Sequence, residues 1–162
     1  HSFPTRRSSN LQPDSGAIWV NGLDITKIRN KKRYYRDTVG FLFQNFALLE
    51  NKNVYQNMVL IQKKGRSGIA VQEALAHVHM SGMEKRKVYQ LSGGEQQRIA
   101  LARLLYKKCD LILADEPTGS LDDENTKIVM QLLHEMNRMG KTVVVVTHNQ
   151  SLLQEGEFVV QI

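Results

Sequence analysis

Two adjacent carboxylates, Asp115 and Glu116, follow the apolar run Leu111–Ala114. A short apolar run is typical of a buried strand, and ligands of open α/β folds bind at the carboxyl edge of the parallel sheet. Neighbouring like charges repel each other unless something uses them. A divalent metal ion can neutralise one carboxylate while the other takes part in proton chemistry. The alternative is an ordinary turn whose carboxylates face water.

A second candidate site is the segment Leu-Ser-Gly-Gly-Glu at 91–95, which opens a predicted helix. Ser92 and Glu95 have the spacing of a capping box. Gly93 and Gly94 leave main-chain N–H groups uncovered, so a phosphate can approach the positive end of the helix dipole. Taken alone, these residues also fit a plain helix cap.

Polar side chains follow two further predicted strands. Gln44 comes directly after 39–43, and His148 follows the β-branched run 142–147. A neutral amide can bind a metal ion and a water molecule, and a histidine there can reach a phosphate. Together with the carboxylate pair, these side chains would meet at one edge of a sheet. That convergence suits phosphoryl transfer from a metal-bound nucleotide.

Hydrophobic periodicity predicts the elements that would position these residues. We expect strands at 17–20, 39–43, 111–114, 142–147 and 158–162, and helices at 53–64, 69–80, 95–106 and 123–139. Asn21-Gly22 predicts a tight turn. The run 142–147 predicts a strand buried on both faces. Strands that alternate with helices favour a parallel α/β sheet.

Composition limits the other classes of protein. The chain has 162 residues, 41% of them hydrophobic, and a single cysteine, which excludes an internal disulfide. No segment reaches the roughly 20 apolar residues of a membrane-spanning helix. The net charge of +6 comes entirely from residues 1–36. The basic run 27–36 is typical of a solvated face, with an acidic partner, an anionic membrane surface or a nucleic acid as alternatives.

In order and spacing, these motifs resemble the ATP-binding subunits of ABC transporters. The segment 91–95 is similar to the signature motif of that family. Leu-Ile-Leu-Ala-Asp-Glu-Pro-Thr at 111–118 resembles the Walker B strand with its catalytic glutamate, and Ser-Leu-Asp at 120–122 resembles the D-loop. His148 matches the switch histidine and Gln44 matches the Q-loop.

The resemblance implies an α/β fold with an incomplete parallel sheet core of the P-loop NTPase type, an inserted helical subdomain and a small antiparallel β element. It covers residues 11–162, with the core at 11–50 and 107–162 and the helical subdomain, which carries the signature motif, at 51–106. It also implies ATP hydrolysis, with ATP and Mg²⁺ as cofactors.

Roles at the sheet edge follow from the same resemblance. Asp115 and Gln44 would hold Mg²⁺, and Gln44 would also sense the nucleotide and relay its state to the membrane partner. Glu116 would polarise the attacking water, and His148 would contact the γ-phosphate.

The signature motif and the D-loop would act between two subunits. Ser92, Gly93, Gly94 and Glu95 would bind the nucleotide held by the opposite subunit of a head-to-tail dimer. Asp122 would lie across that dimer interface.

The resemblance also implies a partner and a location. The helical subdomain would meet the coupling helices of a transmembrane permease at the cytoplasmic face of the cell membrane, where the chain would be peripheral. No nucleic acid is expected. The segments 115–122 and 43–46 resemble the branch that exports macrolides, lipoproteins and antimicrobial peptides, and bacteriocin export is the specific expectation.

The chain departs from the family in one respect. The family has Gly-x-x-x-x-Gly-Lys-Ser/Thr ahead of the segment that resembles 11–16, and this sequence contains no such motif. Residues 1–10 do not resemble what precedes that segment in the family. We therefore expect a truncated chain joined to a foreign segment and inactive alone. The alternatives are a non-catalytic partner subunit that lends its signature motif, and a non-transport ABC ATPase.

Overall fold

The structure is a computed structural model that describes residues 15–28, 31–153 and 159–160. The chain divides into two compact units, 1–32 and 33–162. The predicted strand at 158–162 lies largely outside the described residues, and 159–160 form no strand. No described helix is both long enough and apolar enough to cross a bilayer.

The first unit contains a small antiparallel hairpin of β1 (Trp19–Val20) and β2 (Leu23–Asp24). Asn21 and Gly22 connect the two strands with φ angles of 50° and 73°. Two consecutive left-handed residues are what a tight hairpin turn requires, so the predicted turn is confirmed. A 3-10 helix, η2 (Ile25–Lys27), follows.

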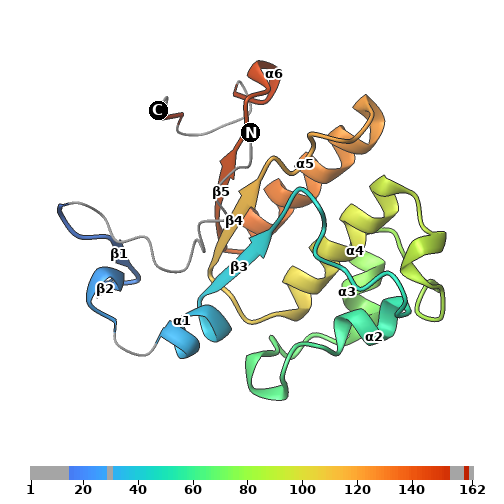
Figure 1. The fold of residues 1–162 in the computed structure, drawn as a ribbon, viewed down its shortest axis with the longest axis horizontal. Helices are drawn as coiled ribbons and strands as arrows, with labels where there is room; N and C mark the ends of the chain where they lie inside the picture. Colours follow the sequence, from blue (N-terminus) through green and yellow to red (C-terminus); the bar gives the residue numbers. More distant parts are fainter. Residues whose placement is uncertain (1–14, 29–30, 154–158, 161–162) are drawn as a thin grey trace, which may run out of the picture. The chain divides into compact units, whose positions relative to one another are not determined.

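The second unit is built on a three-stranded parallel sheet in the order β3 (Val39–Leu42), β4 (Leu111–Asp115) and β5 (Thr142–Val146) (Figure 1). The predicted strands at these positions and the predicted α/β class are therefore confirmed. Leu111 pairs with Val39 on one side and with Thr142 on the other. Because all three strands run in the same direction, their carboxyl ends meet at one edge.

Helices pack against one face of this sheet and against each other (Figure 1). The described helices of this unit are α1 (Lys31–Asp37), which begins in the first unit, α2 (Val54–Met58), α3 (Val71–His77), α4 (Gly93–Tyr106), α5 (Asp123–Arg138) and α6 (Gln150–Leu153), with 3-10 helices η3 (Lys63–Gly65) and η4 (Val88–Gln90). The predicted helix at 53–64 is wrong in length, because α2 ends at Met58. The carbonyls of Val59 and Ile61 accept hydrogen bonds from the Arg66 guanidinium instead of continuing the helix.

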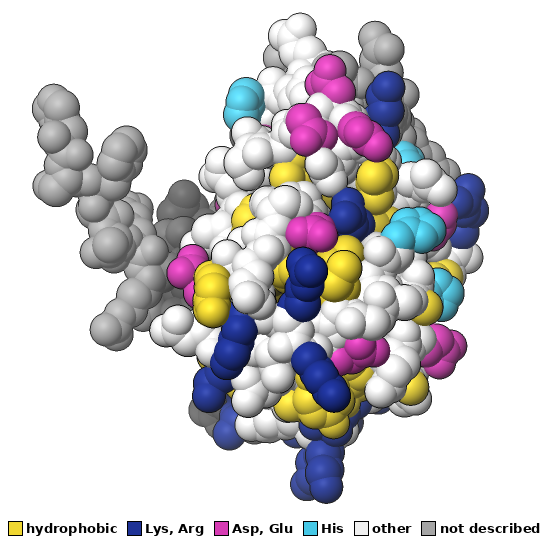
Figure 2. Space-filling model, turned by 90° about the vertical axis from the view of Figure 1, so that its right-hand side faces the viewer, with side chains coloured by type: hydrophobic (Ala, Val, Ile, Leu, Met, Phe, Trp, Pro, Cys, Tyr) yellow, Lys and Arg dark blue, Asp and Glu magenta, His cyan; other side chains and the backbone are white. Residues whose placement is uncertain are grey.

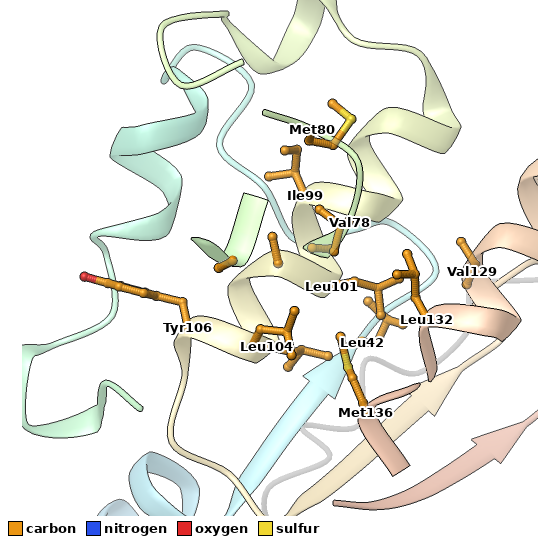
Figure 3. Packing of buried hydrophobic residues seen from close by; sticks show 14 of the residues in the cluster. Leu42, Val78, Met80, Ile99, Leu101, Leu104, Tyr106, Val129, Leu132 and Met136 are labelled. Carbon is orange, nitrogen blue, oxygen red and sulfur yellow. The ribbon is translucent and has the colours of Figure 1, made fainter. Parts of the chain in front are cut away.

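The core joins the sheet to α4 and α5. Leu101 and Leu104 of α4 lie beside Leu42 of β3 and Leu132 of α5, as Figure 3 shows. Gly40 allows β3 to approach α4, since a Cβ there would lie 2.6 Å from a Leu104 methyl group. Burying these side chains contributes roughly 1.5–3 kcal/mol each. The core therefore fixes the strand ends relative to α4.

The prediction that residues 142–147 form a strand buried on both faces is wrong for the part of the chain that the structure describes. Val144 and Val146 are 44% and 56% exposed, while Val143 and Val145 are partly buried. β5 lies at an edge of the described sheet, and α5 packs against only one of its faces. A run of β-branched residues is compatible with a strand buried on both faces, but the run alone does not determine whether other elements cover the second face.

Candidate functional site at the carboxyl edge of the sheet

The carboxylate pair lies where β4 ends. Asp115 is the last residue of the strand and pairs in register with Val146 of β5. The main-chain N–H of Glu116 donates to the carbonyl of Val146 at 2.8 Å, and its φ is 45°. A left-handed residue with a Cβ costs of order 1–3 kcal/mol and is common at active sites.

Glu116 and His148 form a hydrogen-bonded pair. Oε1 of Glu116 accepts from the main-chain N–H of His148 at 2.8 Å and from its Nδ1 at 2.7 Å, and Oε2 accepts from the Thr147 hydroxyl at 3.1 Å. Partial burial raises the pKa of Glu116, but these hydrogen bonds outweigh it and hold the pKa below the ordinary value. A carboxylate acceptor requires a proton on Nδ1, which leaves Nε2 of the 86% exposed His148 side chain for a ligand.

Gln44 lies close to the loop that follows Glu116. Its Nε2 is 3.4 Å from the position that a Cβ on Gly119 would occupy. Because Gln44 follows β3, and β3 pairs with β4, the predicted convergence at this edge agrees with the geometry. A cavity of about 640 Å³ adjoins the same edge and is lined in part by Glu116, Gly119 and His148.

The donor atoms at this edge fit Mg²⁺. No group of three or more His, Cys, Asp or Glu side chains in the described part of the chain could hold a metal ion by itself. Mg²⁺ is usually bound through one or two carboxylates, with phosphate oxygens and water completing its shell. The exposed Asp115 carboxylate and the exposed Gln44 amide offer that kind of incomplete oxygen set.

The signature segment is a capping box, as the spacing predicts. Ser92 Oγ accepts from the main-chain N–H of Glu95 at 3.2 Å, and Glu95 Oε2 accepts from the N–H of Ser92 at 2.7 Å. A Cβ on Gly93 would meet nothing within 4 Å, so this residue is open to a ligand. A Cβ on Gly94 would overlap the side chain of Asn125 on α5, so Gly94 is also needed for packing.

Asp122 caps α5. Its Oδ1 accepts from the main-chain N–H of Asn125 at 2.7 Å, and both of its oxygens accept from the Asn125 amide. These hydrogen bonds lower the pKa of Asp122. Asn125 in turn accepts from Arg98 of α4 at 2.9 Å, so the D-loop segment is tied to the signature helix.

Sequence reasoning missed three residues that support this edge. Buried Gln97 of α4 donates from Nε2 to the carbonyl of Pro117 at 2.5 Å. Arg98 and Asn125 link α4 to α5. No local pattern signals these contacts, because their partners are 20 and 27 positions away in the chain.

Residues 8–119 match the family model described as ABC transporter. The chain belongs to the ABC transporter ATP-binding family. The match begins at residue 8, inside the ten-residue segment for which no likeness was predicted. By family, the chain is an ABC-type ATPase.

Relatives and solved structures agree with this membership. The cell division ATP-binding protein FtsE of Escherichia coli is 37% identical over 153 residues, which cover 91% of this chain and 69% of FtsE. The macrolide export ATP-binding/permease protein MacB of Bdellovibrio bacteriovorus is 36% identical over 155 residues, which cover 93% of this chain and 24% of MacB.

Two solved structures of one ABC cassette share the fold. The dimeric bacterial ABC transporter cassette MJ0796 gives a TM-score of 0.75 at 34% identity, covering 90% of this chain and 68% of that one. A dimeric post-hydrolysis state of MJ0796 bound to ADP and Pi gives a TM-score of 0.72 at 31% identity, with the same coverage of both chains. The fold of the described residues is therefore that of an ABC ATPase cassette.

Proposed function

We propose that this chain is, by type, the ATP-binding and ATP-hydrolysing subunit of an ABC export transporter, which drives substrate efflux, and that the printed sequence, which contains no Gly-x-x-x-x-Gly-Lys-Ser/Thr motif, is inactive alone. The observation that carries the proposal is the Glu116–His148 pair, joined at 2.7 Å, at the carboxyl edge of a parallel sheet beside Asp115. Family membership supports hydrolysis, and the hydrogen-bonded pair supplies an ionised carboxylate next to an exposed imidazole.

The residues at this edge would have three different roles in hydrolysis. Asp115 and Gln44 would hold Mg²⁺, which supplies positive charge against the phosphates when it is bound. Glu116 orients and polarises the attacking water, because an ionised carboxylate accepts a hydrogen bond from it. His148 would donate from Nε2–H to a γ-phosphate oxygen, since ionised phosphate oxygens only accept, while its Nδ1–H donates to Glu116.

The segment 91–95 acts across a head-to-tail dimer. Ser92, Gly93, Gly94 and Glu95 close over the nucleotide of the opposite subunit, and Asp122 lies at the interface. Support comes from the open surface at Gly93 and from the dimeric cassettes with the same fold. The Glu95 carboxylate accepts a hydrogen bond within the cap of its own helix. Glu95 would therefore affect nucleotide binding indirectly, by orienting the first turn of α4.

A transmembrane permease is the proposed partner, and residues 51–106 are the subdomain that meets it. A cavity of about 280 Å³ lies between this subdomain and β3, and its apolar lining includes Phe41, Leu60 and Leu104. A hydrophobic helix end of a permease would fit there. The cassette cbiO1 of Clostridium perfringens, at a TM-score of 0.73 and 26% identity over 86% of this chain and 59% of its own, is part of an ABC transporter complex. The chain would then be peripheral at the cytoplasmic face of the membrane.

Nucleic acid is not among the proposed partners. The side that carries α2 and α3 shows basic, acidic and hydrophobic side chains together rather than a uniformly basic stripe (Figure 2). Three basic residues of the run 27–36 are paired with acidic ones: Lys27 with Asp24 at 3.2 Å, and Arg36 and Arg33 with Asp37 at 2.7 and 3.9 Å.

Turnover of ATP tests the proposal directly. Phosphate release from ATP should be measured with the full chain as its gene encodes it, with Mg²⁺ and then with excess EDTA. We expect release that depends on Mg²⁺. No release from the full gene-encoded chain, together with stimulation of an intact partner ATPase, would instead establish the non-catalytic subunit.

The exported substrate is proposed to be an antimicrobial peptide such as a bacteriocin. The support is the likeness to MacB, a macrolide export protein, together with the segments 115–122 and 43–46. The likeness to FtsE, a cell division protein, favours a second candidate in which the ATPase acts in division. Deletion of the gene separates them: sensitivity to added peptide indicates export, and filamentous cells with unchanged sensitivity indicate division.

A further inference from the structure

The turn that follows Gln44 has an unfavourable main-chain conformation. Phe46 and Ala47 have φ angles of 60° and 46°, so two consecutive residues with a Cβ are left-handed. Such residues are uncommon and persist only where their surroundings hold them. Within the turn, the N–H of Phe46 donates to the carbonyl of Phe43 at 3.0 Å, and the N–H of Ala47 donates to Asn45 at 2.6 Å.

Arg103 of α4 holds this turn from a distance of more than fifty residues in the chain. Its Nη1 donates to the carbonyl of Ala47 at 2.7 Å and its Nη2 to that of Phe46 at 3.1 Å. Burial lowers the pKa of Arg103, and no described carboxylate forms an ion pair with it. A partly buried guanidinium is therefore committed to two main-chain carbonyls.

A second side chain holds the same segment two residues further on. Fully buried Asn57 of α2 accepts from the N–H of Leu49 at 2.8 Å and donates to the carbonyl of Leu49 at 3.1 Å. The chain after Gln44 is thus fixed to both α2 and α4, while the Gln44 side chain itself remains exposed.

We propose that Arg103 is a positioning residue for Gln44: it holds the left-handed turn and so places the Gln44 amide beside the loop of Glu116. This inference rests on the proposed Mg-ATP hydrolysis. The same helix also holds the other loop, because Gln97 binds the carbonyl of Pro117, the residue after Glu116. Gln97 and Arg103 are six residues apart, about 9 Å along one helix, so α4 sets the spacing of both loops.

Two measurements on the full chain as its gene encodes it test the role of Arg103: the Mg²⁺ dependence of ATP turnover, and binding of Mn²⁺ as a Mg²⁺ substitute in the presence of ATP, followed by electron paramagnetic resonance. Arg103→Met should raise the concentration of free Mg²⁺ at half-maximal ATP hydrolysis by about tenfold, the loss typical when a residue that orients a metal ligand is removed. Gln44→Ala should give a similar shift, and the double variant should add little to either, because both changes act through one amide. Additive shifts, or no shift in Arg103→Met, would overturn the proposal.

Arg66→Met is the matched control. Arg66 also donates to two main-chain carbonyls, those of Ile61 and Val59, but on a turn that does not bear Gln44. We expect this variant to lose stability and to keep the wild-type Mg²⁺ dependence. An equal Mg²⁺ shift in Arg66→Met would show that general loosening, rather than the placement of Gln44, causes the effect.

A rescue experiment separates positioning from packing. Ala47→Gly removes the Cβ that makes the left-handed turn costly, so in the Arg103→Met background it should restore part of the Mg²⁺ affinity. If Arg103→Met does not fold, Arg103→Lys serves instead, since one ammonium can still reach a carbonyl and the shift should be smaller. If the folded double variant showed no recovery of Mg²⁺ affinity, Arg103 would not act by holding the left-handed turn. Absent wild-type turnover would instead overturn the proposed function.

Discussion

The loops that follow β3 and β4 share an unfavourable conformation but are held in different ways. Glu116 is left-handed at a φ of 45°, and Phe46 and Ala47 are left-handed at 60° and 46°. The first loop is held through the carboxylate of Glu116, the proposed base, which accepts from Thr147 and His148, and also by Gln97 of α4, which donates to the carbonyl of Pro117. The second is held through its main chain, by a guanidinium and an amide that belong to the neighbouring helices.

Because of this difference, we expect the contacts that hold the two loops to respond to different changes in the molecule. A carboxylate that both holds its loop and takes part in chemistry must exchange partners when a ligand or a proton arrives, so the first loop responds to the reaction itself. The guanidinium stays charged at any working pH and the amide is neutral, so these contacts with the main chain of the second loop change only when α2 or α4 moves. Mg-ATP would contact both loops, through Glu116 and Gln44, and a docked partner that moves α4 would act on both through Gln97 and Arg103.

The largest expected effect comes from Glu116→Gln in the first loop. The amide keeps an oxygen that can accept from His148 but cannot serve as a base, so kcat for ATP hydrolysis should fall by about 10²–10⁴-fold. Mg-ATP binding should be retained. Glu73→Gln, which changes an exposed carboxylate on α3, is the control and should leave kcat unchanged. A near wild-type rate would remove Glu116 from the role of base.

The next effect concerns the helix that supports both loops. Gln97→Leu replaces a fully buried amide by an apolar group of similar size and leaves the carbonyl of Pro117 without its donor. We expect a loss of about 1–3 kcal/mol in the free energy of unfolding, measured with urea, the usual cost of an unpaired buried polar group. Gln131→Leu on the exposed face of α5 should change it by less than about 0.5 kcal/mol. Equal losses of unfolding free energy in the two variants would mean that the hydrogen bond from Gln97 to Pro117 does not stabilise the fold.

Local sequence patterns predicted the contacts between residues that are close in the chain. They did not predict the features that depend on residues far apart in the chain. The capping box of Ser92 and Glu95 spans three residues, so spacing alone reveals it. The strand ends that bear Gln44 and Glu116 follow from apolar runs. The contacts of Arg103 with the turn after Gln44 join residues 56 and 57 positions apart, and no local pattern encodes them. The exposed face of Val144 and Val146 likewise depends on the layers around β5, which its composition does not specify.

A titration separates the two loops by charge. Because its folded-state pKa lies below the ordinary value of 4.5, Glu116 stabilises the fold above that value and loses this contribution as the pH falls through the lowered pKa. The difference in unfolding free energy between wild type and Glu116→Gln should therefore shrink below about pH 4.5. The difference between wild type and Arg103→Met should stay constant across the same pH range. A constant difference for Glu116→Gln would show that its hydrogen bonds do not favour the ionised form.

The smallest effect is expected at Ala47, where the second loop bears part of its strain. Ala47→Gly relieves roughly 1–2 kcal/mol of left-handed strain and costs about 0.4–1 kcal/mol in unfolded-chain entropy, so stability should rise by about 0.5–1 kcal/mol. Ala76→Gly, at an exposed position in α3, is the matched control and should lose about 1 kcal/mol, because no strain offsets the entropy there. Both are measured by urea unfolding. A loss at Ala47 equal to that at Ala76 would mean that the turn is relaxed, and that Arg103 holds it without opposing any strain.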